Sequence, residues 1–278
     1  MKVPAPRRTG TRGQNKSENA SLIRSYYRTL RAAWGPQHWW PAHTAFEVIV
    51  GIFLTQNTAW TNVELALENL RVANLLSIDA IRSVPLPELE RMIRPSGYFP
   101  QKAQRLKAFV AFLDCQYAGS LESLFAQPTN SLREELLTLN GIGPETADSI
   151  LLYAGNHPVF VVDAYTRRIL ERHEILPEKT GYEEIRALFE RALTPAARKT
   201  KTEATEEAKS LWRSQNSYAN FPGTVHTPSA MSTAPRTPLA QVYNDMHGLI
   251  VGVGKHYCKK SQPQCDGCPL QRFLPRSK

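Results

Sequence analysis

Residues 139–170, LNGIGPETADSILLYAGNHPVFVVDAYTRRIL, are the most informative stretch of the sequence. Gly141 and Gly143 permit a tight turn after a helix, because side chains would obstruct such a turn. Pro144 follows at the start of a new helix, where its missing N–H costs least. The exposed amides of this turn, beside a helix N-terminus, can hold a phosphate without reading base sequence. A glycine turn alone is more often purely structural, so the residues that follow it matter more.

Asp163 lies twenty residues beyond Gly143, after the apolar run VFVV and before a predicted helix. In that position aspartate is most often an N-cap, whose side chain accepts a backbone N–H of the helix. A carboxylate at the mouth of a cleft could instead stabilise an oxocarbenium-like sugar and orient or deprotonate a water molecule. The residues by themselves leave both interpretations open.

Apolar residues recur at helical spacing over residues 20–195 and again in the last predicted helix, LAQVYNDMHGLIVGVGKHY. Thr44 followed by Glu47 predicts a capping box. The helix that it opens, AFEVIVGIFL, is apolar on nearly every face, so we expect it to be central and buried. Only VFVV at 159–162 resembles a strand. The chain is therefore predicted to be all-α.

Composition narrows the class of protein. The 278 residues include 34 Lys and Arg against 25 Asp and Glu. The net charge of +9 favours a polyanionic partner such as nucleic acid, although many soluble proteins are as basic. No apolar run is long enough for a transmembrane helix, so we expect no membrane partner. No apolar segment follows the basic start, so we expect no secretory signal and predict a cytoplasmic, nucleoid-associated protein of a bacterium or archaeon.

Two segments have too little apolar surface to join a core. Residues 1–19 are basic and polar, and they predict a disordered arm. Residues 196–236 are charged at first and then rich in Ser, Thr, Pro and Ala, so we predict a flexible insertion.

The pattern L-x-G-x-G-x-x-T-A followed by V-V-D resembles the helix-hairpin-helix (HhH-GPD) glycosylase superfamily, which endonuclease III typifies. The resemblance extends to GIFLTQNTAWTNVE at 51–64 and RPSGYFPQKAQRL at 94–106. It implies one glycosylase domain over residues 20–278, with two all-α lobes and the active-site cleft between them. The implied lobes are a six-helix lobe at 46–160, with its hairpin at 139–143, and a second lobe formed by 20–45 and 161–278.

The resemblance implies that Asp163 is the catalytic carboxylate of a DNA glycosylase acting on double-stranded DNA that contains damaged bases. In strand-cutting members a lysine two residues after the second hairpin glycine attacks the sugar. Here that position is Glu145, which cannot form an imine. We therefore predict a monofunctional, monomeric enzyme of base-excision repair that uses water and leaves an abasic site. The alternatives are a bifunctional glycosylase/AP lyase that uses another amine, and a non-catalytic DNA-binding module.

Further DNA contacts are implied around the hairpin. Gln56 would fill the gap left by the flipped nucleotide, Tyr98 would prop the opposite strand, and Lys102 would hold a phosphate. A helix-end hydrogen bond is the alternative role for Gln56, and an ordinary half-buried ring is the alternative for Tyr98. The remaining implied contacts are Gly141, Gly143 and Thr146.

WWP at 39–41 and FEVIVGIFLTQNTAW at 46–60 resemble most closely the 3-methyladenine DNA glycosylase III branch. In that branch two aromatic rings and a proline frame the flipped base. An alkylated purine is cationic, and a desolvated aromatic slot attracts such a cation by about 1–2 kcal/mol. Core packing is the alternative for these rings. The chain departs from the branch at Trp60, where the branch has another aromatic residue, and at Leu249, where a branch member has lysine. The implied base pocket is Trp39, Pro41 and Trp60, with Trp40 adjacent.

Cys258, Cys265 and Cys268 form a C-x6-C-x2-C loop at 258–268, which matches the first three ligands of the endonuclease III iron–sulfur loop. Leu274 occupies the position of the family's fourth cysteine. Three thiolates can hold a [4Fe–4S] cluster if water or another side chain completes the set. Zinc bound with His256 or His247, and a loop without metal, are the alternatives.

Overall fold

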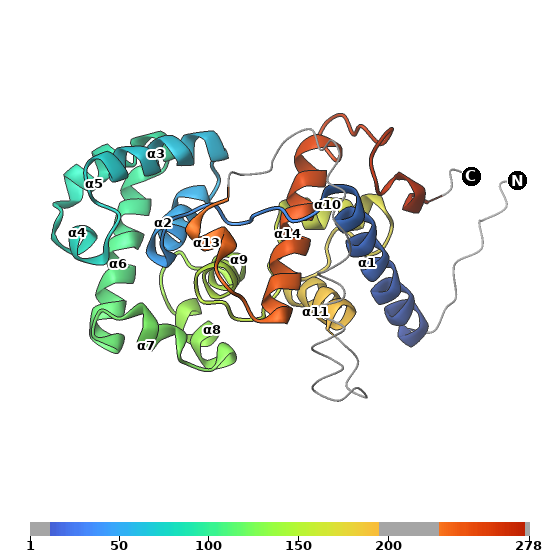
Figure 1. The fold of residues 1–278 in the computed structure, drawn as a ribbon, viewed down its shortest axis with the longest axis horizontal. Helices are drawn as coiled ribbons and strands as arrows, with labels where there is room; N and C mark the ends of the chain where they lie inside the picture. The colour runs from blue at the N-terminus through green and yellow to red at the C-terminus, as the bar shows by residue number, and fades with distance from the viewer. Residues whose placement is uncertain (1–11, 195–227, 276–278) are drawn as a thin grey trace, which may run out of the picture. The chain divides into compact units, whose positions relative to one another are not determined.

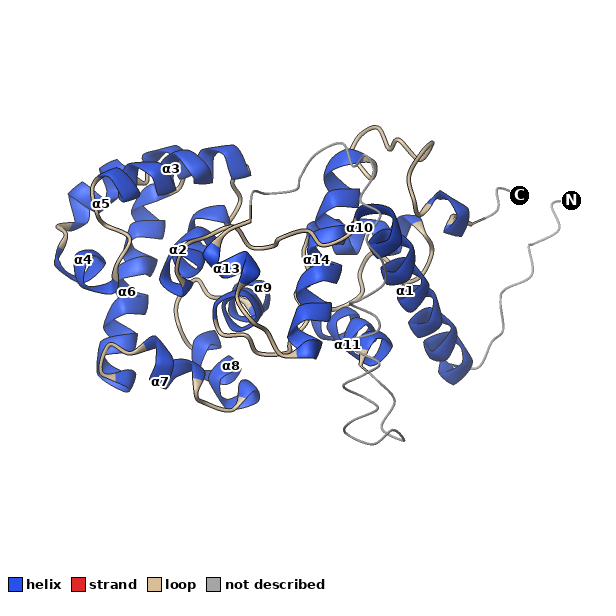
Figure 2. Ribbon diagram, in the orientation of Figure 1, coloured by secondary structure: helices blue, strands red, loops and turns tan. Residues whose placement is uncertain are grey.

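The computed structural model describes residues 12–194 and 228–275, and every regular element in these ranges is a helix (Figures 1 and 2). The all-α prediction is confirmed. The VFVV segment at 159–162, which resembled a strand, is buried but forms no strand within the described residues. None of the helices in the described ranges combines the length and hydropathy needed to cross a membrane.

Contacts between residues divide the chain into two compact units. Within the described residues, the hairpin unit comprises 36–163 and 228–248, and the cysteine unit comprises 12–35, 164–194 and 249–275. The hairpin unit holds the predicted turn, Asp163 and the tryptophans of the implied pocket, and the cysteine unit holds the C-x6-C-x2-C loop.

The hairpin unit is built around the buried helix α2 (Ala45–Thr55). Residues 46–54 are all buried, and α2 packs against α3, α6, α9 and the π-helical turn η2. The Thr44 hydroxyl accepts the Glu47 N–H at 3.1 Å, as predicted, while the Glu47 carboxylate accepts the His43 N–H at 2.8 Å. The other elements are α3 (Trp60–Val72), α4 (Ile78–Ser83), α5 (Leu86–Met92), η1 (Arg94–Ser96), α6 (Phe99–Tyr117), α7 (Leu121–Phe125), α8 (Thr129–Leu137), α9 (Pro144–Ser149), η2 (Ile150–Ala154), α13 (Ala230–Thr233) and the first part of α14 (Pro238–His256).

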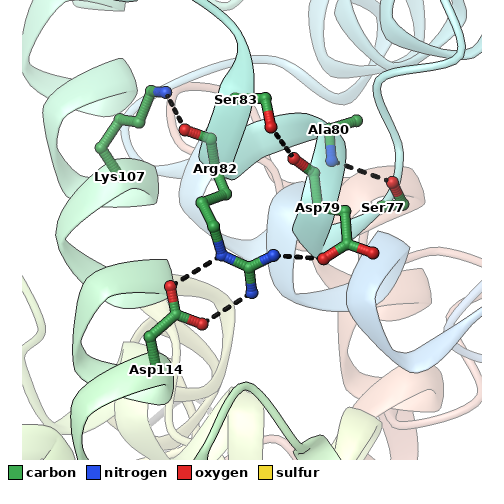
Figure 3. Close-up of polar contacts among 7 residues, drawn as sticks. All are labelled: Ser77, Asp79, Ala80, Arg82, Ser83, Lys107 and Asp114. Carbon is green, nitrogen blue, oxygen red and sulfur yellow. Dashed lines mark hydrogen bonds and ion pairs between the residues drawn. The ribbon is translucent and has the colours of Figure 1, made fainter.

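Polar contacts near the surface orient the short helix α4 against α6 (Figure 3). The Arg82 guanidinium donates from Nε and Nη2 to the two oxygens of Asp114, at 2.8 and 2.7 Å, and also contacts Asp79. The hydrogen bonds from Arg82 lower the pKa of the Asp114 carboxyl. Lys107 Nζ donates to the carbonyl of Arg82 at 3.0 Å. Because water screens these charges, the contacts position α4 but add little free energy of folding.

The cysteine unit packs α1 (Arg12–Trp34) against α11 (Tyr182–Leu193) and also contains α10 (Ala164–Arg172), the end of α14 and η3 (Gln271–Phe273). The predicted disordered arm at 1–19 was wrong in its second half, because α1 begins at Arg12. Residues 1–11 lie outside the described residues. Asn19 donates to the carbonyl of Ile175 at 3.1 Å and so anchors the helix. Once anchored, a helix gains one backbone hydrogen bond for each residue that extends it.

The end of the predicted flexible insertion is ordered, which corrects the prediction for residues 228–236. Residues 195–227 lie outside the described residues. The Arg236 guanidinium donates to the carbonyls of Leu152 and Tyr153 in η2, at 2.9 and 3.2 Å. These acceptors are 84 and 83 residues away in the chain, so the local composition of the insertion could not reveal them.

Candidate active site

The predicted hairpin connects α8 to α9. Gly141 has φ +82°, a left-handed conformation that favours glycine, and a Cβ at this position would lie 2.0 Å from Nε of Arg105. Gly143 is the N-cap of α9, and the space where its Cβ would lie is open. Pro144 is the first helical residue, as predicted. Glycine is therefore required at position 141 by conformation and contact, but at position 143 by neither.

Gln56, at the end of α2, holds the hairpin from inside the unit. Its Nε2 donates to the carbonyl of Gly141 at 3.1 Å and to the hydroxyl of Thr146 at 3.0 Å. Its Oε1 accepts from Arg105 at 2.5 Å. Thr146 is buried and its side chain supports the turn, and its DNA contact stays a prediction. Insertion of Gln56 into a DNA gap stays a prediction, and it would require breaking these three hydrogen bonds.

A buried ion pair joins the two helices that flank the hairpin. Arg133 of α8 donates from Nε and Nη2 to the two oxygens of Asp148 of α9, at 2.6 and 3.1 Å. The Asp148 side chain is fully buried, and that of Arg133 is 13% exposed. Such a bidentate pair fixes the geometry between two helices. The sequence pattern singled out neither residue, because each is an ordinary charged side chain of a predicted helix.

Lys102 is buried rather than exposed to DNA. Its ammonium donates to the carbonyls of Leu54 and Ser96, at 2.8 and 2.7 Å, and to the hydroxyl of Thr58 at 2.7 Å. Leu54 supplies one of the last carbonyls of α2, which lack partners within the helix. Burial lowers the pKa of Lys102 to about 8. The predicted phosphate contact is therefore wrong. Tyr98 at the start of α6 is 67% exposed, which permits its predicted wedge role without testing it.

Asp163 follows the buried run 159–162 and precedes α10 in the sequence. Its side chain is 12% exposed, and its Oδ2 lies 3.6 Å from Nε2 of His247 in α14. Nδ1 of His247 lies 2.6 Å from the hydroxyl of Tyr153. Burial lowers the pKa of His247, against the opposing effect of the Asp163 charge, and burial raises the pKa of Tyr153. The carboxylate thus faces a buried imidazole, which the sequence pattern did not reveal.

The tryptophans of the implied pocket form one aromatic cluster. The Trp40 ring meets those of Trp39 and Trp60 edge to face, with centroids 5.3 and 5.2 Å away and interplanar angles of 67° and 82°. The Trp39 ring lies 6.0 Å from that of His247. Trp39 and Trp40 are buried, and Trp60 is half-buried. The cluster therefore extends from an accessible ring, Trp60, to the imidazole beside Asp163, and in this conformation its rings make edge contacts rather than a parallel slot.

Pro41 and Trp60 also line a hollow of the hairpin unit with an acidic lining. Its lining includes three carboxylates and one guanidinium, those of Glu47, Glu64, Glu68 and Arg71. Arg71 bonds to Glu47 at 2.5 Å and contacts Glu68. Because the negative charges outnumber the positive one, this lining attracts a cation more than an anion. The sequence pattern indicated only a helix-capping role for Glu47.

The three cysteines of the 258–268 loop line one cavity of the cysteine unit. Leu274, at the position of the fourth cysteine, lines the same cavity and offers no donor atom. His173 also lines it, but its Nδ1 is bonded to the Tyr26 hydroxyl at 2.6 Å. In the part of the chain that the structure describes, no three His, Cys, Asp or Glu side chains are placed to hold a metal ion together. These donors do not fit a cluster held by four thiolates.

Comparison with known proteins places this geometry in a family. Residues 50–195 match the model of the HhH-GPD superfamily of base excision DNA repair proteins. A Methanocaldococcus jannaschii protein named as a candidate DNA repair glycosylase is 36% identical over 259 residues, which are 93% of this chain and 98% of that protein. The H. pylori 3-methyladenine DNA glycosylase MagIII, solved bound to 1,N6-ethenoadenine, is 29% identical, with a TM-score of 0.63 over 85% of this chain and 97% of that chain. A trapped endonuclease III–DNA covalent intermediate shares the fold, with a TM-score of 0.64 and 20% identity over 91% of this chain and 94% of that one.

Proposed function

The chain belongs to the HhH-GPD superfamily of base excision DNA repair proteins and is a DNA glycosylase, and we propose that it removes alkylated purines such as 3-methyladenine from duplex DNA by hydrolysis. The observation that carries this proposal is the continuity of the aromatic cluster, from half-buried Trp60 to Trp39, with the imidazole that faces Asp163. The rings that we propose frame the base and the carboxylate that we propose acts on its sugar lie in one compact unit.

The preference for an alkylated purine follows from charge. Alkylation at N3 or N7 makes the purine cationic, and the face of an indole ring attracts such a cation by about 1–2 kcal/mol once both are desolvated. The acidic hollow beside Trp60 and Pro41 adds attraction of the same sign. The name of the H. pylori relative supports the same substrate class. The edge-to-face rings would have to separate before a flipped base could stack between them.

Asp163 supplies the chemistry in this proposal. As the bond from C1′ to the purine nitrogen breaks, its electron pair neutralises the cationic base, so the departing base needs no acid. The Asp163 carboxylate stabilises the oxocarbenium-like sugar. Water then forms a bond to C1′ and gives its proton to Asp163, which passes it to solvent. The products are a free base and an abasic site.

The use of water rather than an amine rests on Glu145. This residue is exposed in the first turn of α9 and occupies the position where strand-cutting relatives carry their lysine. A carboxylate cannot form a Schiff base with the sugar, so we propose that the enzyme is monofunctional.

Release of methylated bases from methylated duplex DNA tests the proposal. We expect wild type to release them and Asp163→Asn to do so about 100-fold or more slowly, while both bind duplex DNA equally. A wild-type protein that binds duplex DNA but releases no base from any lesion in a panel would instead be a non-catalytic binding module. Release of oxidised or mismatched bases alone would reject the alkylpurine assignment.

Borohydride trapping separates the two enzyme classes. We expect no covalent adduct between wild type and an abasic duplex, because no lysine lies at position 145. Glu145→Lys provides a matched comparison, since it restores an amine at that position. An adduct with wild type would support the bifunctional alternative.

A further inference from the structure

We propose that His247 is a positioning residue for Asp163, and that the Tyr153 hydroxyl holds its imidazole with Nε2–H directed at the carboxylate. The inference rests on the proposed catalytic role of Asp163. It concerns three residues of the hairpin unit that lie far apart in the sequence and are brought together by η2, the end of the 159–162 run and α14.

The tautomer of His247 follows from its partners. The Tyr153 hydroxyl is 2.6 Å from Nδ1, and burial, which raises the pKa of Tyr153, keeps the proton on that hydroxyl. The distance alone allows either atom to donate, but an Nε2 without a proton would turn its lone pair towards the Asp163 oxygen 3.6 Å away. We therefore place the proton on Nε2, so that the Tyr153 hydroxyl donates and Nδ1 accepts. A neutral imidazole that accepts at Nδ1 carries its proton on Nε2. The charged form would place a cation in a site where the His247 side chain is only 5% exposed, and burial lowers the pKa of His247 accordingly.

The Nε2 atom is buried and has no hydrogen-bond partner. Oδ2 of Asp163 lies 3.6 Å from Nε2, which is too long for a hydrogen bond. A buried donor without a partner is destabilising. The geometry points to closure of this gap when the sugar and water are in place, so that Nε2–H holds one oxygen of the Asp163 carboxylate.

The surroundings of His247 keep its ring in this orientation. The rings of Trp39, Tyr153 and Phe160 pack around it, with centroids 6.0, 5.7 and 6.4 Å away. The next residue, Gly248, lets α14 approach the chain closely, since a Cβ there would lie 3.2 Å from that of Trp39. Asn244, one turn earlier, donates to the carbonyl of Trp39 at 2.5 Å. The same helix therefore positions both the imidazole and a ring of the proposed base pocket.

Substitution separates this role from a purely structural one. His247→Leu removes the donor, and we expect base release in single turnovers to fall about 10- to 100-fold, with DNA affinity unchanged, because a carboxylate displaced by a fraction of an ångström loses alignment. His247→Gln keeps an N–H donor at a similar distance and should recover most of that loss. In an Asp163→Asn background, His247→Leu should have no further effect on base release. A full additional loss in that background, or an unchanged rate for folded His247→Leu, would overturn the proposal.

Nuclear magnetic resonance of 15N-labelled histidine tests the inference without any activity. We expect the His247 ring to be neutral at pH 8, with its proton on Nε2, and to stay neutral below the ordinary imidazole pKa of 6.5. The charge of Asp163 affects the pKa of both His247 and Tyr153, and the charges of Glu145 and Arg236 also affect the pKa of Tyr153. Tyr153→Phe should shift the population towards the Nδ1–H tautomer. A ring protonated on Nδ1 in wild type would reject the inference even if the enzyme proved to have another substrate, whereas inactivity on methylated DNA with the expected tautomer would reject only the substrate.

Discussion

The hairpin at 139–143 and the cysteine loop at 258–268 are both visible as spacing patterns, but different contacts hold them. The hairpin lies between helices that a buried pair, Arg133 with Asp148, locks together from inside. The cysteine loop is held by Arg172 of α10, which donates to the carbonyls of Lys259 and Lys260 at 2.6 and 2.8 Å. The three cysteines of the loop line a cavity together with Leu274, whose side chain has no atom that could bind a metal. A motif can thus specify a backbone path while residues outside the motif hold it in place.

The buried pair offers the largest test of this contrast. Asp148→Asn removes the negative charge that Arg133 contacts in the interior, so we expect the free energy of unfolding to fall by about 3–5 kcal/mol. Urea unfolding followed by circular dichroism measures the change. Arg82→Ala is the matched control, since it breaks the fork to Asp114 at the surface (Figure 3), and it should have far less effect. Similar losses for the two variants would contradict the distinction between buried and exposed pairs.

The buried lysine of the hairpin unit predicts a pH dependence. The pKa of Lys102 is about 8 in the folded chain, against an ordinary value of 10.5, so between these values the unfolded chain binds more protons. The stability contributed by Lys102 therefore rises with pH through this window, by up to about 3 kcal/mol. Unfolding free energies of wild type and Lys102→Met, compared from pH 7.5 to pH 10.5, isolate this contribution. A constant difference between the two proteins would show that Lys102 titrates normally.

The two hairpin glycines provide a smaller and closely matched test. Gly141→Ala places a Cβ against Arg105 in a left-handed conformation, and we expect a loss of about 1–3 kcal/mol in stability together with weaker binding to duplex DNA. Gly143→Ala adds its Cβ in open space, so stability should change by less than about 0.5 kcal/mol. Thermal unfolding and fluorescence anisotropy with a labelled duplex report both effects. Equal behaviour of the two variants would mean that the turn tolerates a side chain at 141.

The smallest expected effect on stability is in the cysteine loop. Leu274→Cys supplies a fourth thiol in the wall of the cavity, and we expect it to raise the iron and sulfide retained per chain after aerobic purification, with little change in the melting temperature. Iron analysis and the yellow-brown colour of a [4Fe–4S] centre provide the measurement. Equal iron in wild type and variant would show that the fourth side chain does not limit retention.

The contacts around the hairpin show where prediction from sequence succeeded and where it failed. The turn at Gly141, the start of α9 at Pro144 and the burial of α2 were predicted correctly, because each depends on residues within a few positions of one another. Lys102 was predicted at the surface and is buried, because its three acceptors come from α2, from η1 and from the loop that joins α2 to α3. The prediction of a flexible insertion failed at residues 228–236 for the same reason, since Arg236 donates to distant carbonyls in η2.

Local chemistry therefore specified the all-α character, the glycine turn and the carboxylate that follows it, since glycine sterics, proline at a helix start and apolar periodicity act over short stretches of chain. Tertiary packing alone assembled Tyr153, His247 and Asp163. Tyr153 and His247, whose side chains are in contact, are 94 residues apart in the sequence. Burial there lowers the pKa of His247 and leaves its Nε2 facing a single carboxylate, and no spacing rule in the sequence encodes a desolvated site made from three distant segments.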